Sequence, residues 1–499
     1  MLLYLRWVCG LSAALGLGLL AAGLVFADPR FALIGLGHLS VPALLFFPAL
    51  SSRQVSPFDP LMLTLFWVIT GAVMPAYFLA FGSGARLDFL MNGQDLDHFV
   101  VGAIWVVAGL LVTSFAYSAT GGARARVERV IPNDAGVTIG GAVWVALLAI
   151  AVAWLAIFTF LQQTGGITGL EALSRKRTIL IASEGGVSVH GSAAYLRALS
   201  QAVLPALIVV VGLALRRTRQ FRPIAWVATA ALVLSAAALP FFTSSRSETA
   251  FVFLALALAL YASNALRPRH VLVGLIVAGT LFGAMTGLRS IAQNGPAESL
   301  IVNPVVGIAS AGNGMSVIAT SHIMAGVPGR MDYRLGSTYL TWVTAPIPRS
   351  MWPNKPDPSL GKDIRAEILG HNVLRSGMPP SILTEGHINF GWPGFFVAAL
   401  AFGALLRFVA NTFLPLLRAN VFAPAVYYVA LVTTAGLTTS SVSQGIVRAL
   451  TDLTMAAAVI VLLRVLSPQP RIGAVVGARR IGREAHIRAA QRPGTQARR

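Results

Sequence analysis

The stretch from Phe99 to Ala119, FVVGAIWVVAGLLVTSFAYSA, contains no acidic or basic residue. At the rise of an α-helix it is about 30 Å long, which matches the hydrocarbon core of a bilayer. Only helices and closed barrels satisfy every backbone polar group in hydrocarbon, and the stretch lacks the alternating pattern of a barrel strand. It therefore predicts a transmembrane helix.

Runs of this kind repeat along the chain. Of its 499 residues, 56% are hydrophobic and 11% are charged, a composition that excludes a water-soluble enzyme. The predicted spans lie near residues 4–26, 31–50, 60–81, 99–119, 138–161, 193–215, 224–243, 248–263, 271–289, 390–410, 421–440 and 449–466. The sequence thus predicts an all-α fold, a polytopic transmembrane helical bundle of about 12 spans.

The net charge of +20 is a topology signal, because the basic residues gather in alternate linkers and in the tail. One side carries Arg53, Arg124, Arg126, Arg129, Arg216, Arg217, Arg219, Arg222, Arg267, Arg269, Arg407, Arg418 and the basic tail. The short linkers of the other side carry only Arg30, Arg86, Arg246 and Arg448. The positive-inside rule makes the first side cytoplasmic, with both termini on it.

Two segments on the opposite side are too long to be simple connectors. A loop near 162–192 interrupts the first nine spans, which occupy 1–289, and a loop at 290–389 precedes the last three spans at 390–466. Long loops carry function more often than short connectors do. Within the second loop, the semi-apolar stretch from Val302 to Gly326 predicts an interfacial or re-entrant helix. The basic segment 467–499 predicts a disordered cytoplasmic tail that is attracted to anionic lipids.

Two polar segments of the second loop carry the most informative motifs. They are APIPRSMWPNKPD at 345–357 and PPSILTEGHINFGWPG at 379–394. They resemble the Wzy-type O-antigen and exopolysaccharide polymerases, in which Pro-Arg-Ser-x-Trp-Pro-x-Lys-Pro precedes Gly-Glu-x-Tyr-x-Asn-Phe-Gly at the next span. SSRSE at 244–248 resembles a span start of the same family. Two positions depart from the pattern, because Thr384 replaces Gly and His387 replaces Tyr.

The resemblance implies a membrane glycosyltransferase of GT-C-like architecture in a bacterial inner membrane, with two larger periplasmic loops. The implied reaction polymerises undecaprenyl-diphosphate-linked oligosaccharide repeat units at the periplasmic face, with no cofactor and no metal. Lipid-linked glycans, membrane lipids, a chain-length regulator and a flippase are the implied partners, and nucleic acid is not among them.

The chemistry of this reaction selects the candidate site residues. A diphosphate leaves as a stable anion, so the site needs fixed cations, and Arg suits bidentate phosphate contacts. We expect Arg349 to act in catalysis, and diphosphate binding to use Arg246, Arg175, Lys355, Arg365, Arg375 and Arg289. In each large loop ten residues separate an Arg from a Gly, Arg175 from Gly186 and Arg375 from Gly386, a spacing that chance also produces.

The acceptor hydroxyl needs a base, and Glu385 or His387 is best placed beside the membrane. Glu385 fits equally well as a cap of the next span or as the partner of an Arg. The segment Asp95-Leu-Asp97-His98 resembles a metal-binding Asp-x-Asp motif, but two acids near a helix start more often interact with the helix dipole at its N-terminus.

Two other functions fit the same sequence. An O-antigen ligase, or another enzyme acting on lipid-linked sugars, shares the many spans and the large external loop. A polysaccharide transporter or flippase commonly shows internal repeats and charged residues within its spans. The predicted spans contain almost no acidic residue apart from Asp452, and the halves show no repeat, which favours the enzyme.

Overall fold

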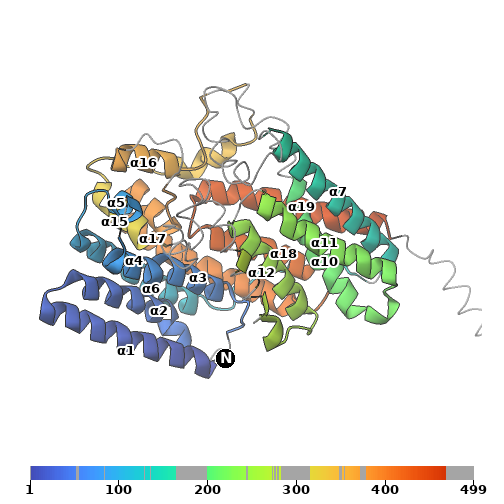
Figure 1. Cartoon of the computed structure of the whole chain (residues 1–499), viewed down its shortest axis with the longest axis horizontal. Coiled ribbons are helices and arrows are strands. Elements are labelled where there is room, and N and C mark those ends of the chain that lie inside the picture. Colours follow the sequence, from blue (N-terminus) through green and yellow to red (C-terminus); the bar gives the residue numbers. More distant parts are fainter. Residues whose placement is uncertain are drawn as a thin grey trace, which may run out of the picture.

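The computed structural model describes residues 2–51, 55–83, 85–127, 130–134, 136–163, 199–242, 246–271, 273–274, 277, 280–281, 315–347, 351–352, 354–370 and 378–467. Throughout these ranges the regular elements are helices, and strands are absent. Figure 1 shows these helices packed side by side. The chain is therefore a helical protein, as its apolar runs predict.

Eight helices of the described residues are long and apolar enough to cross a membrane. These spans are Leu3–Phe26, Pro29–Leu50, Pro60–Phe81, Leu96–Ala119, Ile139–Thr159, Pro223–Pro240, Ile382–Leu416 and Val442–Val465. They belong to α1 (Leu2–Phe26), α2 (Pro29–Leu50), α3 (Pro60–Val68), η1 (Ile69–Val73), α4 (Met74–Phe81), α6 (Leu96–Ala119), α7 (Ile139–Gln163), α11 (Pro223–Phe242), α17 (Ile382–Phe413) with η5 (Leu414–Leu416), and α19 (Val442–Val465). All eight lie at predicted positions, so the helical membrane class is confirmed.

Three further predicted spans coincide with apolar helices that are shorter than the eight spans above. They are α10 (Val203–Arg216), α12 (Arg246–Ala262) and α18 (Ala423–Gly436). The predicted span at 271–289 lies largely outside the described residues, as do the predicted loop at 162–192 and the tail. The total of about 12 spans therefore stays a prediction.

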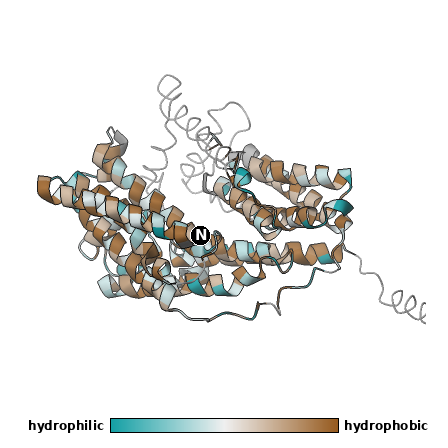
Figure 2. Cartoon of the chain, turned by 90° about the horizontal axis from the view of Figure 1, so that it is seen from below, coloured by the Kyte–Doolittle hydropathy of each residue, from teal (hydrophilic) through white to brown (hydrophobic). Residues whose placement is uncertain are grey.

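The bundle has two apolar cores. The first joins α1 to α6 with α17, and the second joins α7, α10, α11, α12, α18 and α19. In Figure 1, α1 and α2 lie at one end and α7 and α11 at the other. Figure 2 shows hydrophobic residues, in brown, along most of the helices, and many of them face outward, as Leu3, Trp7 and Leu24 of α1 do. Helices that are apolar on both their buried and their exposed faces are typical of a protein surrounded by lipid.

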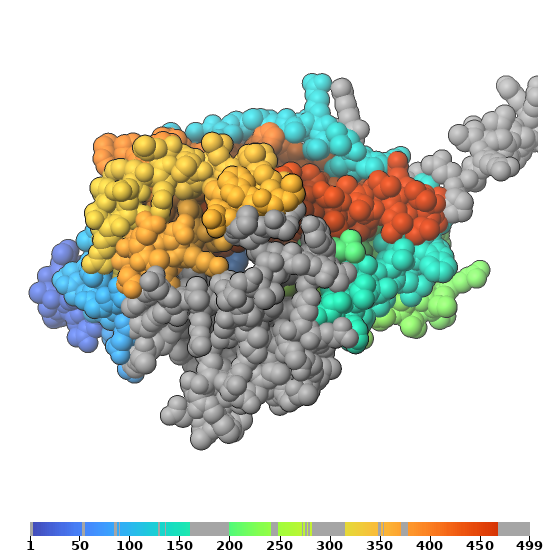
Figure 3. Space-filling model, turned by 90° about the horizontal axis from the view of Figure 1, so that it is seen from above, coloured from blue at the N-terminus to red at the C-terminus, as the bar shows by residue number. Residues whose placement is uncertain are grey.

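The helices of the loop segments gather on one side of the bundle. These are α5 (Ala85–Met91), α15 (Val317–Gly326), η4 (Ser337–Thr344) and α16 (Gly361–Leu369). In Figure 3 residues 315–370, in yellow and gold, form a continuous surface beside the start of α17, in orange. The described part of the semi-apolar stretch, α15, packs against α6 and α16, and it shares a small third core with α16 and the start of α17. We call this side the loop face.

Candidate functional site

The site is built on a kink near the start of α17. The helix begins at Ile382, where Ser381 accepts from the Thr384 N–H and Thr384 in turn accepts from the Ser381 N–H. The helical dihedrals break at Phe390 and Gly391, and Gly391 has a φ of 68°. A left-handed residue of this kind favours glycine. The motif residues 382–389 thus form a separate first arm of α17, before the kink.

Glu385 lies in the first turn of this arm and has no exposed surface. Its carboxylate accepts a hydrogen bond of 2.8 Å from the Thr338 hydroxyl and another from the Val442 N–H. No Arg side chain of the described residues forms an ion pair with it. Ser381 is the cap of α17, and among the described residues Glu385 is held by Thr338 and by the first N–H of α19.

Asn389 shares a face with Glu385 one helical turn later and connects the same segments. Its amide nitrogen donates to the Thr338 hydroxyl (2.7 Å) and to the Glu385 carbonyl (2.8 Å), while its oxygen accepts from the Gly336 N–H (2.8 Å). Ser443, at the start of α19, donates to the Thr338 carbonyl and accepts from the Trp342 N–H. We call Glu385, Asn389, Thr338 and Ser443 the carboxylate centre.

The carboxylate centre joins three segments that are far apart in sequence, namely η4, the first arm of α17 and the start of α19. Tyr339 lies beside it, and burial together with the Glu385 carboxylate raises the pKa of the Tyr339 phenol to about 12. The phenol therefore remains a neutral hydrogen-bonding group at physiological pH. Chemically, the centre offers one carboxylate surrounded by neutral donors, which is a suitable proton acceptor once a substrate reaches it.

His387 is also buried but lies on a different side of the arm. Its ring packs against Tyr333 with 6.4 Å between centroids. Its ring nitrogens are shielded from solvent and lie near the backbone of Val327 and Gly391 without a well-formed hydrogen bond. Glu385 and His387 are therefore both buried, but they lie on different surfaces of the arm.

The predicted cations have different positions. Lys355 donates to the carbonyls of Ala345 (3.0 Å) and Ile347 (2.7 Å), so its side chain binds the backbone at the start of the same Pro-rich segment. Arg365 is buried in α16. Arg246 begins α12, but its side chain lies outside the described residues. Arg349, Arg175, Arg375 and Arg289 also lie outside them.

An ion pair on α19 was not among the predicted site residues. Arg448 lies 3.5 Å from Asp452, and its guanidinium lies 4.8 Å from the centre of the Phe251 ring. At 1.5 Å of rise per residue, Arg448 follows Val442 by roughly 9 Å along α19. The sequence does contain a signal, because an Arg and an Asp four residues apart at the start of a span form a helical pair.

The predicted Asp-x-Asp motif caps a helix. Asp95 is the N-cap of α6 and accepts from the His98 N–H at 3.1 Å. The described residues hold no group of three or more His, Cys, Asp or Glu side chains that could bind a metal. The His98 ring instead packs 5.1 Å from that of His322, whose Nε2 lies 2.9 Å from the Leu90 carbonyl oxygen. Capping is therefore the role that the geometry gives Asp95.

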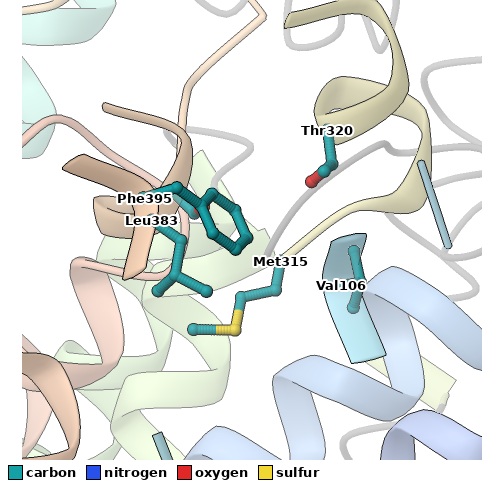
Figure 4. A pocket seen from close by; sticks show the side chains of 6 residues that line it. Val106, Met315, Thr320, Leu383 and Phe395 are labelled. Atoms are coloured by element: carbon teal, nitrogen blue, oxygen red, sulfur yellow. The ribbon is translucent and has the colours of Figure 1, made fainter. Parts of the chain in front are cut away.

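A small apolar pocket lies beneath the first arm, between α6, α15 and α17. Figure 4 shows Val106, Met315, Thr320, Leu383 and Phe395 around it. Thr320 and Ser381 are the polar residues of its lining, so the pocket is too apolar for a sugar. The polar chemistry of this side of the bundle thus belongs to the carboxylate centre.

The chain matches no family model, no curated protein and no solved structure.

Proposed function

We propose that the chain is an inner-membrane glycosyltransferase that polymerises undecaprenyl-diphosphate-linked oligosaccharide repeat units into O-antigen or exopolysaccharide. The observation that carries the proposal is the buried carboxylate centre. The motif that resembles the polymerases supplies Glu385 and Asn389, and the loop before it supplies Thr338. In the proposed topology of about 12 spans, the loop face is periplasmic and both termini are cytoplasmic.

In the proposed reaction, the acceptor sugar hydroxyl attacks the anomeric carbon of the donor glycan. The bond from that carbon to the diphosphate oxygen breaks, and the lipid diphosphate leaves with the bonding electron pair. The hydroxyl proton passes to the Glu385 carboxylate, with His387 as the second candidate base. Of the cations predicted from the sequence, Arg349 and Arg246 are the foremost candidates to offset the charge of the departing diphosphate.

The burial of Glu385 adds a requirement to this mechanism. Because the Thr338 hydroxyl occupies one carboxylate oxygen, η4 must shift before an acceptor hydroxyl reaches that oxygen. A substrate hydroxyl would then replace the Thr338 hydroxyl as donor. The proposed site is thus closed at rest and opened by substrate.

Purified protein in proteoliposomes, supplied with lipid-linked repeat units, tests the proposed activity. A polymerase produces a ladder of longer lipid-linked glycans without any other acceptor. Transfer of a single unit that occurs only after lipid A core oligosaccharide is added would identify a ligase and would contradict the proposal.

A further inference from the structure

In η4, polar side chains face the protein and apolar side chains face outward. A 3-10 helix has three residues per turn, so side chains three apart form rows. One row is polar: Thr338 is buried against the bundle, and Thr341 and Thr344 are half-buried. The outward row begins with the exposed Ser337 and continues with Leu340, which is 65% exposed, and Val343, which is 56% exposed. A loop surrounded by water would show the opposite arrangement.

The outward row belongs to a larger apolar surface. Leu335 is 77% exposed just before η4, and Phe390 is 51% and Trp392 64% exposed at the kink of α17. Contact joins the two segments, because the Tyr339 and Phe390 rings lie 6.4 Å apart. We call Leu335, Leu340, Val343, Phe390 and Trp392 the outer apolar patch.

The outer apolar patch is continuous with a surface that meets lipid in a membrane-spanning helix. After Trp392, α17 exposes Val397, Leu400 and Phe408, which repeat at helical spacing along the span. Trp and other large apolar side chains favour the boundary between headgroups and acyl chains. The Arg334–Glu367 ion pair borders the patch at Leu335, and the continuity of the patch with the spanning surface of α17 favours lipid as its partner.

We propose that the outer apolar patch is inserted in the bilayer interface, so that η4 lies on the membrane surface with its threonines facing the protein. This inference rests on the membrane nature of the bundle and is independent of the proposed catalysis. If the proposed function also holds, insertion places the carboxylate centre at headgroup depth, because Thr338 contacts Glu385 directly. That is the level at which a lipid-linked diphosphate is located.

Site-directed spin labelling of the full chain in liposomes tests the insertion. Cys9 is the only cysteine, so Leu335→Cys and Leu340→Cys are made separately in a Cys9→Ser background. Ala366→Cys, on the outer surface of α16, is the aqueous control. Val397→Cys, which is exposed on the spanning part of α17, is the lipid control. Collision of each label with oxygen and with a water-soluble nickel chelate is then measured.

Oxygen-to-nickel collision ratios at positions 335 and 340 are expected to lie closer to the ratio at 397 than to that at 366. Ratios equal to that at 366 would show a patch in water and would overturn the inference. Protection from both reagents would indicate contact with a second copy and would overturn it as well. Neither result would bear on polymerisation, because that reaction is measured separately.

Discussion

At the scale of single residues, Glu385 and Asn389 are distinguished by the neutrality of their surroundings. A buried carboxylate is normally held by a cation or by hydrogen bonds, and Glu385 has the hydroxyl of Thr338 and the N–H of Val442. The bonds of Asn389 to Thr338 and Gly336 connect the same loop to α17. Glu385 and Asn389 therefore hold η4 against α17, and they also form part of the candidate site.

Asn389→Ala is expected to destabilise the protein, because it removes one hydrogen bond from each of three groups: the half-buried Gly336 N–H, the buried Thr338 hydroxyl and the buried Glu385 carbonyl. Each unsatisfied buried group costs about 1–3 kcal/mol. The midpoint of thermal unfolding in detergent should fall, while Asn354→Ala, at an exposed loop position, should match wild type. Equal midpoints for the two variants would contradict the role given to Asn389.

His322 predicts a pH dependence of stability. Burial, with smaller effects of His98 and Arg330, lowers the pKa of His322 from 6.5 to about 4. The unfolded chain therefore binds this proton more readily than the folded chain, so stability is lost as the pH falls from about 6.5 towards about 4. His322→Gln should reduce this decline when unfolding is followed across that range. An unchanged decline would show that other groups cause it.

At the scale of elements, the apolar runs predicted the helices but not where α17 begins. The predicted span starts at 390, whereas the helix starts at Ile382. The polar side chains of Thr384, Glu385, His387 and Asn389 interrupt the apolar pattern, because protein and not lipid surrounds them. Thr338 and Ser443 could not be predicted for a related reason: hydroxyl residues in distant segments carry no spacing signal.

The kink in α17 is expected to depend on Gly391. A side chain at a φ of 68° costs about 1–2 kcal/mol, and a Cβ there would also lie 3.1 Å from the Tyr333 hydroxyl. Gly391→Ala should therefore lower the thermal midpoint and disturb the first arm. Gly212→Ala, in the interior of α10 with nothing near its Cβ position, is the control and should be neutral or stabilising. Similar loss in both would point to a general effect of the substitution.

At the scale of the whole molecule, the positive charge has a structural use besides topology. On the side opposite the loop face, Arg217 donates to the Val137 carbonyl (2.6 Å) and Arg464 to the Asn133 carbonyl (2.9 Å). These bonds connect linkers that are distant in sequence. Composition and charge predicted which linkers are basic, but not which carbonyls they bind, because those contacts depend on the three-dimensional packing of the helices.

The proposed topology predicts opposite labelling on the two sides of the bundle. In a Cys9→Ser background, a membrane-impermeant maleimide should label Ala366→Cys in intact spheroplasts. It should label Arg219→Cys only after the membrane is permeabilised, because the basic linkers lie in the cytoplasm. The reverse pattern would invert the topology and place the loop face in the cytoplasm.

The central claim is that the Glu385 carboxylate serves the polymerisation of lipid-linked glycans. The most direct test compares Glu385→Gln with Glu367→Gln, which removes a half-exposed carboxylate of the same loop that pairs with Arg334. Chain extension in proteoliposomes is measured per amount of folded protein. Loss of a general base predicts a rate lower by about 100-fold or more for Glu385→Gln, with Glu367→Gln close to wild type. Chain extension by Glu385→Gln at the wild-type rate would contradict the claim.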